Sequence, residues 1–121
     1  LHHHEANIFE QICREFIREK EVTTVGSWWW KQHEIDVVAT DEDEARLLLG
    51  ECKWTTKPIG ISVYESLKEK AKHVRWKNNK RTEEYALFSR NGFTDELIKA
   101  ADDGVKLFTS EDLHNHFTET Q

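Results

Sequence analysis

Two short stretches of the chain, EIDVVA at residues 34–39 and LGECKW at residues 49–54, decide the fold. Both are rich in apolar residues that favour strands, and the acidic segment between them indicates a turn. Side chains alternate between the two faces of a strand, so Glu51 and Lys53 point to the same face, and Asp36 can lie opposite them on the neighbouring strand. We therefore expect two carboxylates and one ammonium group to meet at one place on a hairpin.

Helical and extended patterns continue on both sides of this hairpin. Apolar residues at helical spacing predict an amphipathic first helix over residues 4–20. Beyond the hairpin, Ser62 and Glu65 have the spacing of a capping box, which predicts a second helix that runs to about Trp76. The other expected elements are strands at 22–31, 33–40, 45–54, 85–89 and 105–108, a short helix capped by Thr94 and ended by Gly104, and a final helix opened by Ser110, Glu111 and Asp112. This order, α-β-β-β-α-β-α-β-α, predicts an α/β fold with a mixed sheet of about five strands flanked by helices.

Length, charge and cysteine content narrow the classes of protein to which the chain can belong. Its 121 residues are enough for one hydrophobic core, so we expect residues 1–121 to form a single domain. Cys13 and Cys52 form no spaced cluster, which argues against a disulfide framework and favours a reducing, cytoplasmic setting. No apolar run reaches the ~20 residues of a membrane-spanning helix, so we expect no membrane partner. The net charge of −6 means that any DNA contact must come from a local basic patch.

The expected meeting of acidic and basic side chains is suited to metal-assisted hydrolysis. Carboxylate oxygens are the ligands that Mg²⁺ and Mn²⁺ prefer, and Asp36 and Glu51 would supply them. Glu10 lies at the edge of the apolar stripe of the first helix, so it is available as a third metal-binding carboxylate. Lys53 would hold or deprotonate the attacking water and stabilise the charge that develops on a phosphate.

Ordinary surface roles would explain the same residues. Asp36 and Lys53 would then form a surface ion pair, and Glu51 and Glu10 would be solvated acids. The spacing D-x(14)-E-x-K is weakly specific in a chain with 23 acidic and 17 basic residues. The metal site therefore depends on the context of the pattern.

That context is a resemblance to a known superfamily. A helix with Glu10, a strand with Asp36, a strand with Glu51 and Lys53, and a following helix and strand resemble in order the PD-(D/E)XK nuclease core. This superfamily includes archaeal Holliday-junction resolvases and many restriction enzymes. The resemblance implies a restriction-endonuclease-like fold, with Asp36, Glu51 and Lys53 as the catalytic set, Glu10 as the helix-borne acid, and the three carboxylates as metal ligands. Ile35 stands where the name of the motif has proline.

A narrower resemblance covers nearly the whole chain. The C-terminal nuclease-like domain that follows the ATPase module of archaeal and bacterial AAA-type ATPases is similar to four segments: GSWW at 26–29, EIDVVA at 34–39, GECKW at 50–54 and LFSRNGFT at 87–94. The resemblance implies that residues 1–121 were excised from the C-terminus of a larger ATPase, with Leu1 as the first residue of the excised domain. The upstream ATPase domain would then be a partner.

Positive charge gathers in the second predicted helix and the loop after it. Its best candidates for contact with DNA phosphates are Lys68, Lys72, Arg75 and Lys77. The alternative is a solvated helix face whose lysines pair with Glu65 and Glu69. Both interpretations are left open, although the helix directly follows the strand of Lys53.

Two other clusters of aromatic or imidazole side chains have more than one interpretation. Three consecutive tryptophans, at residues 28–30, could stack on exposed bases, but strand alternation puts Trp29 on the face opposite its neighbours, and core packing or contact with the ATPase module is favoured. The histidines at residues 2–4 are either native or the remnant of a tag. We assign no zinc role to them, nor to His114 and His116, which do not share a helix face.

Two functions follow from these observations. The first is a Mg²⁺- or Mn²⁺-dependent deoxyribonuclease that uses Asp36, Glu51, Lys53 and Glu10. The second is a catalytically silent module of nuclease fold that binds DNA or docks on its own ATPase domain. The intact set of acids and lysine favours the first, and the acidic net charge and the run of three tryptophans, expected to be exposed, favour the second. The sequence leaves open which DNA structure is cut and whether a homodimer forms.

Overall fold

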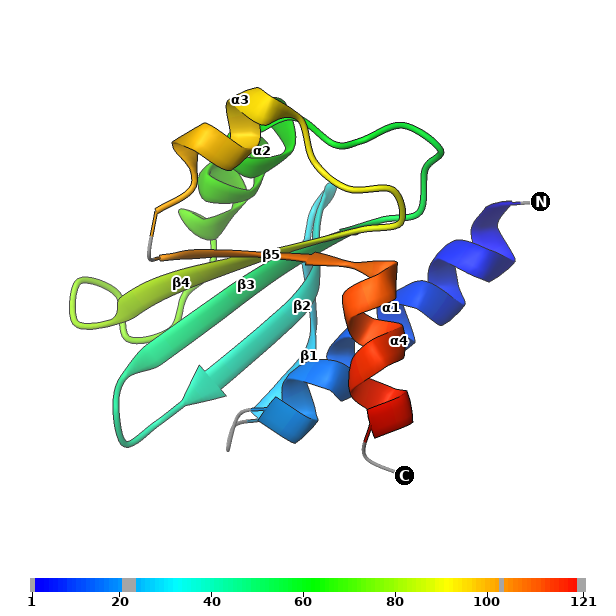
Figure 1. Ribbon diagram of the computed structural model, residues 1–121. Helices are drawn as coiled ribbons and strands as arrows, with labels where there is room; N and C mark the ends of the chain where they lie inside the picture. The colour runs from blue at the N-terminus through cyan, green and yellow to red at the C-terminus, as the bar shows by residue number, and fades with distance from the viewer. Residues whose placement is uncertain (1, 21–23, 103, 120–121) are drawn as a thin grey trace.

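A computed structural model describes residues 2–20, 24–102 and 104–119, and its elements follow the expected order (Figure 1). The elements are α1 (His2–Lys20), β1 (Thr24–Trp30), β2 (His33–Asp41), β3 (Arg46–Lys53), α2 (Ile61–Ala71), β4 (Thr82–Ser89), α3 (Asp95–Ala100), β5 (Val105–Thr109) and α4 (Ser110–Glu119). Leu1, the first two residues of the strand expected at 22–31, and the side chains of His2 and His3 lie outside the described part of the chain.

The five strands form one mixed sheet in the order β1-β2-β3-β4-β5, which confirms the predicted fold class. β1, β2 and β3 are antiparallel neighbours because short turns join them. β4 runs parallel to β3 and β5 parallel to β4, and helices α2 and α3 make the crossovers that parallel neighbours need. The sheet therefore changes from antiparallel to parallel at β3, the strand that carries Glu51 and Lys53.

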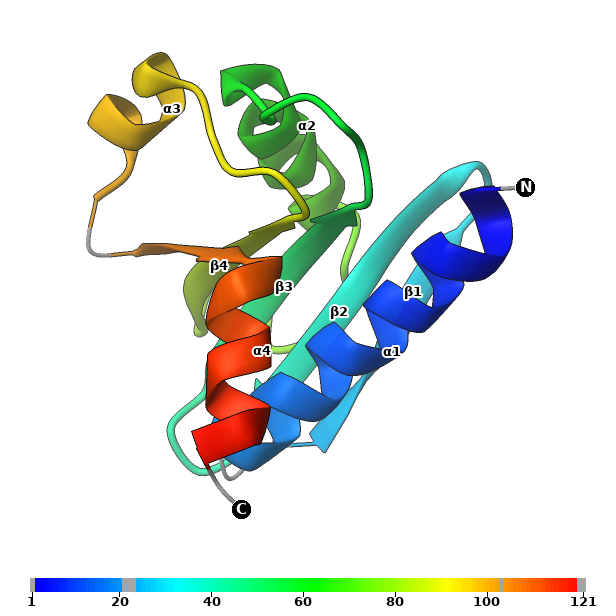
Figure 2. The same cartoon turned by 45° about the vertical axis from the view of Figure 1, so that its right-hand side comes forward.

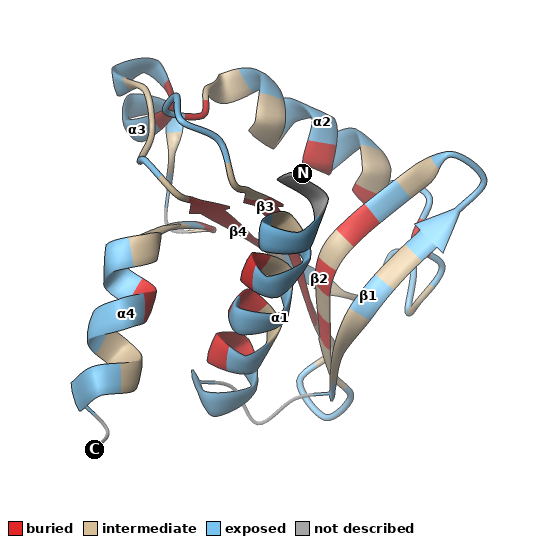
Figure 3. Cartoon of the chain, turned by 90° about the vertical axis from the view of Figure 1, so that its right-hand side faces the viewer, coloured by how far each residue is buried: buried red, intermediate tan, exposed pale blue. Residues whose placement is uncertain are grey.

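Helices cover both faces of the sheet (Figure 2). α1 and α4 lie on one face, where Phe9, Cys13 and Phe16 of α1 and Leu113 of α4 pack on the strands. α2 and α3 lie on the other face and pack a second apolar cluster. The two clusters bury both faces of β3 and β4, whereas β1 stays largely exposed (Figure 3). The interior strands are thus held on both sides, as parallel strands require.

α2 differs from the prediction at both ends. Its N-cap is Gly60, which has no side-chain capping hydrogen bond, so the predicted capping box of Ser62 and Glu65 is wrong. Ile59 forms a β-bridge with Phe93, and the chain enters the helix directly after this bridge, two residues earlier than expected. The helix ends at Ala71 rather than near Trp76.

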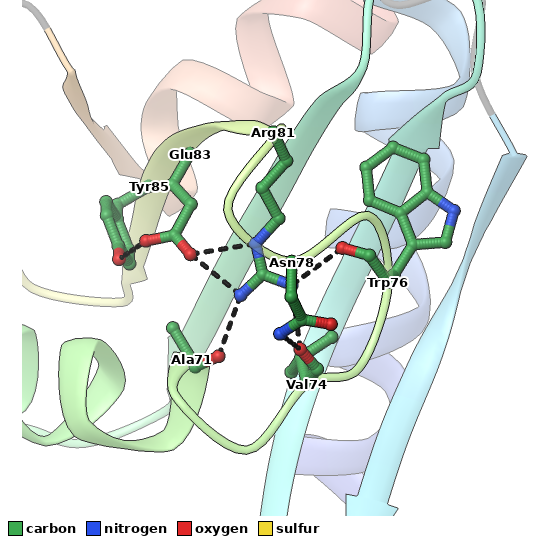
Figure 4. A network of polar contacts seen from close by, with 7 residues as sticks. All are labelled: Ala71, Val74, Trp76, Asn78, Arg81, Glu83 and Tyr85. Atoms are coloured by element: carbon green, nitrogen blue, oxygen red, sulfur yellow. Dashed lines mark hydrogen bonds and ion pairs between the residues drawn. The ribbon is translucent and has the colours of Figure 1, made fainter.

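Arg81 explains why α2 ends early (Figure 4). Its guanidinium donates hydrogen bonds to the carbonyl oxygens of Ala71 at 3.0 Å, Val74 at 2.7 Å and Trp76 at 2.9 Å. The last carbonyl groups of a helix lack partners within the helix; here the arginine adds a donor to the carbonyl of Ala71 and ties the next turns of the chain to the end of α2. The same guanidinium lies 2.7 Å from the carboxylate of Glu83, and its side chain is 5% exposed.

The later elements follow the prediction with shifted boundaries. β4 begins at Thr82, inside the polar segment before the expected strand, because Thr82 pairs with Arg46 of β3. The hydroxyl of Thr94 caps α3 by accepting from the N–H of Leu97, which confirms the predicted cap. Gly104 does not end α3, since the chain leaves the helix at Ala101, where the backbone is already extended.

α4 begins at Ser110 as expected. Its cap comes from the last residue of β5: Thr109 and Asp112 exchange hydrogen bonds between their side chains and backbone N–H groups. In the described ranges, no helix is both long and apolar enough to span a bilayer.

Candidate active site between β2 and β3

The candidate site lies where β2 and β3 separate. Their last backbone pair is Val37 with Gly50. Beyond it a side chain joins the two strands, because Asp36 Oδ2 accepts a hydrogen bond from the N–H of Cys52 at 2.8 Å. Gly50 is needed at this point, because a Cβ atom there would lie 3.0 Å from the Cβ of Val37. The Asp36 carboxylate is therefore fixed between the two strands.

A β-bulge in β2 sets the direction of Asp36. Gly26 pairs with Val38 and Trp28 pairs with Ile35, so β2 has one more residue than β1 between these two pairs. Such an extra residue bends the strand and redirects the side chains beside it. As a result Ile35 packs with the α2-side cluster and Val37 with the α1-side cluster, although strict alternation would put both on the same face.

Glu51 is the most altered acid of the site. It is only 6% exposed, and its pKa rises to about 7, first because of burial and then because of the nearby Asp36 carboxylate. Lys70 and Lys53 act in the opposite direction, and Lys70 Nζ lies 3.3 Å from Glu51 Oε1. Burial and Asp36 thus disfavour the charged form of Glu51, and the ammonium groups of Lys70 and Lys53 partly offset this effect.

A hollow of about 240 Å³ opens beside Glu51 on the α2 side of the sheet. Glu51 and Lys53 reach it from β3, and Ser62, Ser66 and Lys70 reach it from α2. These three α2 residues are spaced four apart, so they share one helix face. Two ammonium groups and two hydroxyl groups make this hollow chemically suited to an oxyanion such as a phosphate.

A second, smaller hollow of about 140 Å³ lies on the α1 side, and Glu10 and Asp36 both line it. Arg14 Nη1 donates to the backbone carbonyl of Asp36 at 2.8 Å and lies 3.9 Å from Glu10 Oε1. Burial raises the pKa of Glu10, with a further rise from the Asp36 carboxylate. Glu10 therefore interacts electrostatically with Asp36 on the α1 side of the sheet, whereas Glu51 lies on the α2 side.

The acids fit a small hard cation only in part. The Asp36 carboxylate adds to the rise in the pKa of Glu51, because two neighbouring carboxylates repel each other unless a cation or a proton lies between them. Mg²⁺ commonly keeps several waters and takes only one or two protein carboxylates, so this pair could hold it. However, within residues 2–20, 24–102 and 104–119 no three Asp, Glu, His or Cys side chains are grouped closely enough to hold a metal ion.

The four basic residues expected to contact DNA lie on α2 and in the segment after it. The Lys68 ammonium lies 4.3 Å from the centre of the Tyr64 ring, Lys72 pairs with Glu69 at 2.9 Å, and Arg75 is exposed. Lys77 pairs with Glu42 at 3.1 Å. The pairing of Lys72 with Glu69 is a contact expected of a solvated helix face. The exposed side chains can still contact a phosphate.

Sequence reasoning missed two residues of the site. The sequence pattern assigns Lys70 no role at Glu51, although the spacing of Ser62, Ser66 and Lys70 along one helix face is a signal for it. Arg14 was not considered, although it stands four residues after Glu10 on α1.

The chain matches the model of the family DUF234, described as archaeal and bacterial proteins of unknown function, over residues 1–86. No curated protein sequence shows a significant match.

Two solved structures share the fold. A protein of unknown function, AF1548, superposes with a TM-score of 0.63 at 21% sequence identity, over 91% of this chain and 66% of that one. A repair endonuclease from Pyrococcus abyssi superposes with a TM-score of 0.50 at 14% identity, over 81% of this chain and 45% of that one. The chain therefore spans less than two thirds of either protein, and at these identities the likeness shows a nuclease-like fold alone.

Proposed function

Because the chain belongs to the DUF234 family and has a nuclease-like fold, we propose that it hydrolyses DNA phosphodiester bonds with the help of a divalent metal ion. The observation that carries this proposal is the opening between β2 and β3. There the N–H of Cys52 fixes the Asp36 carboxylate, and the neighbouring buried Glu51 carboxylate lines, together with the Lys53 ammonium, a hollow of about 240 Å³. We assign this arrangement to the PD-(D/E)XK type, as the sequence motif suggests.

Asp36 and Glu51 would hold Mg²⁺ or Mn²⁺, with Glu10 contributing from α1 through its charge. When bound, the metal would lower the pKa of a coordinated water and neutralise charge on the phosphate. The chain's own residues supply the rest. Lys53, which lines the hollow, would hold the attacking water and stabilise the charge that develops on the phosphate oxygens. Lys70, with Ser62 and Ser66, would hold the phosphate from the α2 side.

Cleavage assays with matched variants test the proposal. Wild type, Asp36→Asn, Lys53→Ala and Lys57→Ala would be incubated with supercoiled plasmid, branched DNA and single strands, in Mg²⁺, Mn²⁺ or a chelator. Asn keeps an oxygen that can accept from the Cys52 N–H, so Asp36→Asn removes charge without removing that hydrogen bond. Lys57 is an exposed lysine in the loop after β3 and serves as the control.

We expect wild type and Lys57→Ala to cleave at equal rates and only with metal. Lys53→Ala should cleave at least about 100-fold more slowly, because it removes a group that acts on the water and the transition state. Its affinity for DNA and its thermal unfolding should change little. Equal cleavage by wild type and Lys53→Ala, or no cleavage of any substrate by wild type, would contradict the proposal.

Two observations favour the second candidate function, a silent module that binds DNA. Lys70 already pairs with Glu51, and the described residues contain no group of three metal-binding side chains. An ammonium in that position can take the place of a metal in neutralising Glu51. Titration calorimetry with Mn²⁺ separates the two functions: the nuclease should bind Mn²⁺ and lose that binding in Asp36→Asn, whereas the silent module should show no binding heat.

The cellular setting belongs to the proposal as well. We propose that the chain works in the cytoplasm as the C-terminal nuclease-like domain of a larger ATPase, with that ATPase domain and DNA as its partners. The resemblance of residues 26–29, 34–39, 50–54 and 87–94 to such domains supports this setting. Light scattering of the purified chain would determine whether it forms a homodimer.

A further inference from the structure

Trp29 is an exposed aromatic side chain beside the candidate site. It is 74% exposed, and within the part of the chain that the structure describes no other ring stacks on it. Its neighbours are used differently. Trp28 packs against the α2-side cluster, and the Trp30 ring stacks at 5.1 Å on His73 and carries the Lys31 ammonium at 4.5 Å. These contacts fix the end of the β1–β2 hairpin and leave the face of Trp29 available.

Trp29 shares the 140 Å³ hollow with the candidate catalytic acids. Asp36, Glu10 and Glu34 line the same space, with Arg14 as its cation. Three carboxylates make this hollow unfavourable for a phosphate. Carboxylates do, however, accept hydrogen bonds from the amino groups of nucleobases, and an aromatic face stacks on a base of any sequence.

The two hollows differ in chemistry, and each is lined by one acid of the pair Asp36 and Glu51. The α2-side hollow, with Lys53, Lys70 and two serines, suits a phosphate, and the α1-side hollow suits a base. Asp36 lines the α1-side hollow and Glu51 lines the α2-side hollow, and Asp36 Oδ2 accepts a hydrogen bond at 2.8 Å from the N–H of Cys52, the residue after Glu51. A nucleotide bound across them would place its base at Trp29 and its phosphate at Lys53.

We propose that Trp29 stacks on an unpaired nucleobase next to the phosphodiester at Asp36 and Glu51, so that the substrate is DNA with an unpaired nucleotide at the site. This inference rests on the proposed function. A base inside a duplex is covered on both faces by its neighbours, so only an unstacked base offers a face to Trp29. Stacking also does not require net positive charge, which this chain lacks with its formal charge of −6.

Binding measurements with matched variants test the inference. The anisotropy of a fluorescein-labelled short single strand and of its blunt duplex would be followed for wild type, Trp29→Ala, Trp29→Phe and Ile98→Ala. Ca²⁺ would replace Mg²⁺ so that the probes are not consumed. Ile98 is an exposed apolar residue of α3, at 52% exposure, so its variant controls for the loss of exposed apolar area.

We expect Trp29→Ala to weaken binding of the single strand about five- to 150-fold, the range that one stacked base supplies. Duplex affinity should change less than about twofold, Trp29→Phe should recover most of the loss, and Ile98→Ala should behave as wild type. A probe with one abasic nucleotide at the bound position should weaken wild type but not weaken Trp29→Ala further, because both changes remove the same contact.

Several outcomes would overturn the inference: unchanged single-strand binding in Trp29→Ala, an equal loss for single strand and duplex, or no DNA binding by wild type. If Trp29→Ala instead loses association with a protein and keeps its DNA affinity, Trp29 is a protein contact, and the inference is again overturned. The proposed function fails separately. If wild type binds the single strand through Trp29 but never cleaves DNA, the proposed nuclease activity is wrong and the base site at Trp29 stands. If wild type and Trp29→Ala both cleave duplex and single strand at equal rates, the nuclease activity stands and the base site is wrong.

Discussion

The carboxyl group of Glu51 lies in a mostly buried position between an aspartate and two lysines. Burial and Asp36 raise its pKa to about 7, above the ordinary value of about 4.5 that it has in the unfolded chain. Between these values the folded state binds a proton that the unfolded state has already lost. The free energy of unfolding must therefore fall as pH rises from about 4.5 through about 7.

We predict that Glu51→Gln removes this fall. Glutamine keeps the shape of the protonated acid and cannot ionise, so the variant should be more stable than wild type at pH 8 by up to about 3 kcal/mol, and close to it below about pH 4.5. Urea unfolding at a series of pH values, with a chelator present, measures the difference. Glu65→Gln, the same change at an exposed position of α2, should match wild type throughout. Parallel pH profiles for wild type and Glu51→Gln would contradict the assigned pKa.

At the residue scale, the sequence was informative where strand alternation is regular. Glu51 and Lys53 were expected on one face, and both line the α2-side hollow. The place of Asp36 depends on a bulge between Ile35 and Val38 that no Gly or Pro marks, so alternation alone could not give its direction. The contact of Lys70 with Glu51 depends on how α2 packs on the sheet, and that packing is a tertiary property.

At the scale of elements, apolar periodicity and capping residues predicted the helices and strands, while capping contacts decided where they begin and end. The first helix and the hairpin strands could be predicted because their apolar residues repeat with one period. The end of α2 could not, because Arg81, which donates a hydrogen bond to the carbonyl of its last residue, Ala71, lies ten residues further along the chain. A pattern of local residues contains no sign of such a distant partner.

We predict that Arg81→Ala destabilises the fold by about 2–4 kcal/mol. The change removes three hydrogen bonds to the carbonyl oxygens of Ala71, Val74 and Trp76, at the end of α2 and in the segment after it, and it leaves Glu83 without the Arg81 cation. Chemical unfolding at neutral pH would measure the loss. Arg75→Ala removes an exposed arginine from the same region and should stay within about 0.5 kcal/mol of wild type. Similar stabilities for the two variants would show that Arg81 does not hold the end of the helix.

At the scale of the whole molecule, the site lies between two layers of helices and takes residues from both. α1 supplies Glu10 and Arg14, the sheet supplies Asp36, Glu51 and Lys53, and α2 supplies Lys70. Charge is distributed unevenly around this site. The chain carries a net charge of −6, yet Lys68, Lys72, Arg75 and Lys77 all lie on α2 or just after it. A DNA strand attracted to the molecule should therefore approach from the α2 side.

This distribution makes the salt dependence of DNA binding a test of where the strand lies. Each phosphate that a basic residue neutralises releases counterions, and the plot of log affinity against log salt steepens by about 0.7 per contact for a single strand. We predict that the combined variant Lys68→Ala, Lys72→Ala and Arg75→Ala binds a single strand more weakly than wild type, with a salt slope that is smaller by up to about 2. Its unfolding should be unchanged, because all three side chains are exposed.

The control must remove the same charge from elsewhere, since any loss of cations makes an acidic protein repel DNA more. Arg18→Ala, Lys20→Ala and Lys99→Ala together do so from α1 and α3, again at exposed positions. This control should weaken binding slightly and leave the salt slope as in wild type, because long-range repulsion neutralises no phosphate. If both triple variants lower the slope equally, the strand does not run along α2. If neither does, affinity comes from contacts other than these lysines and arginines, and the aromatic face of Trp29 becomes the first place to look.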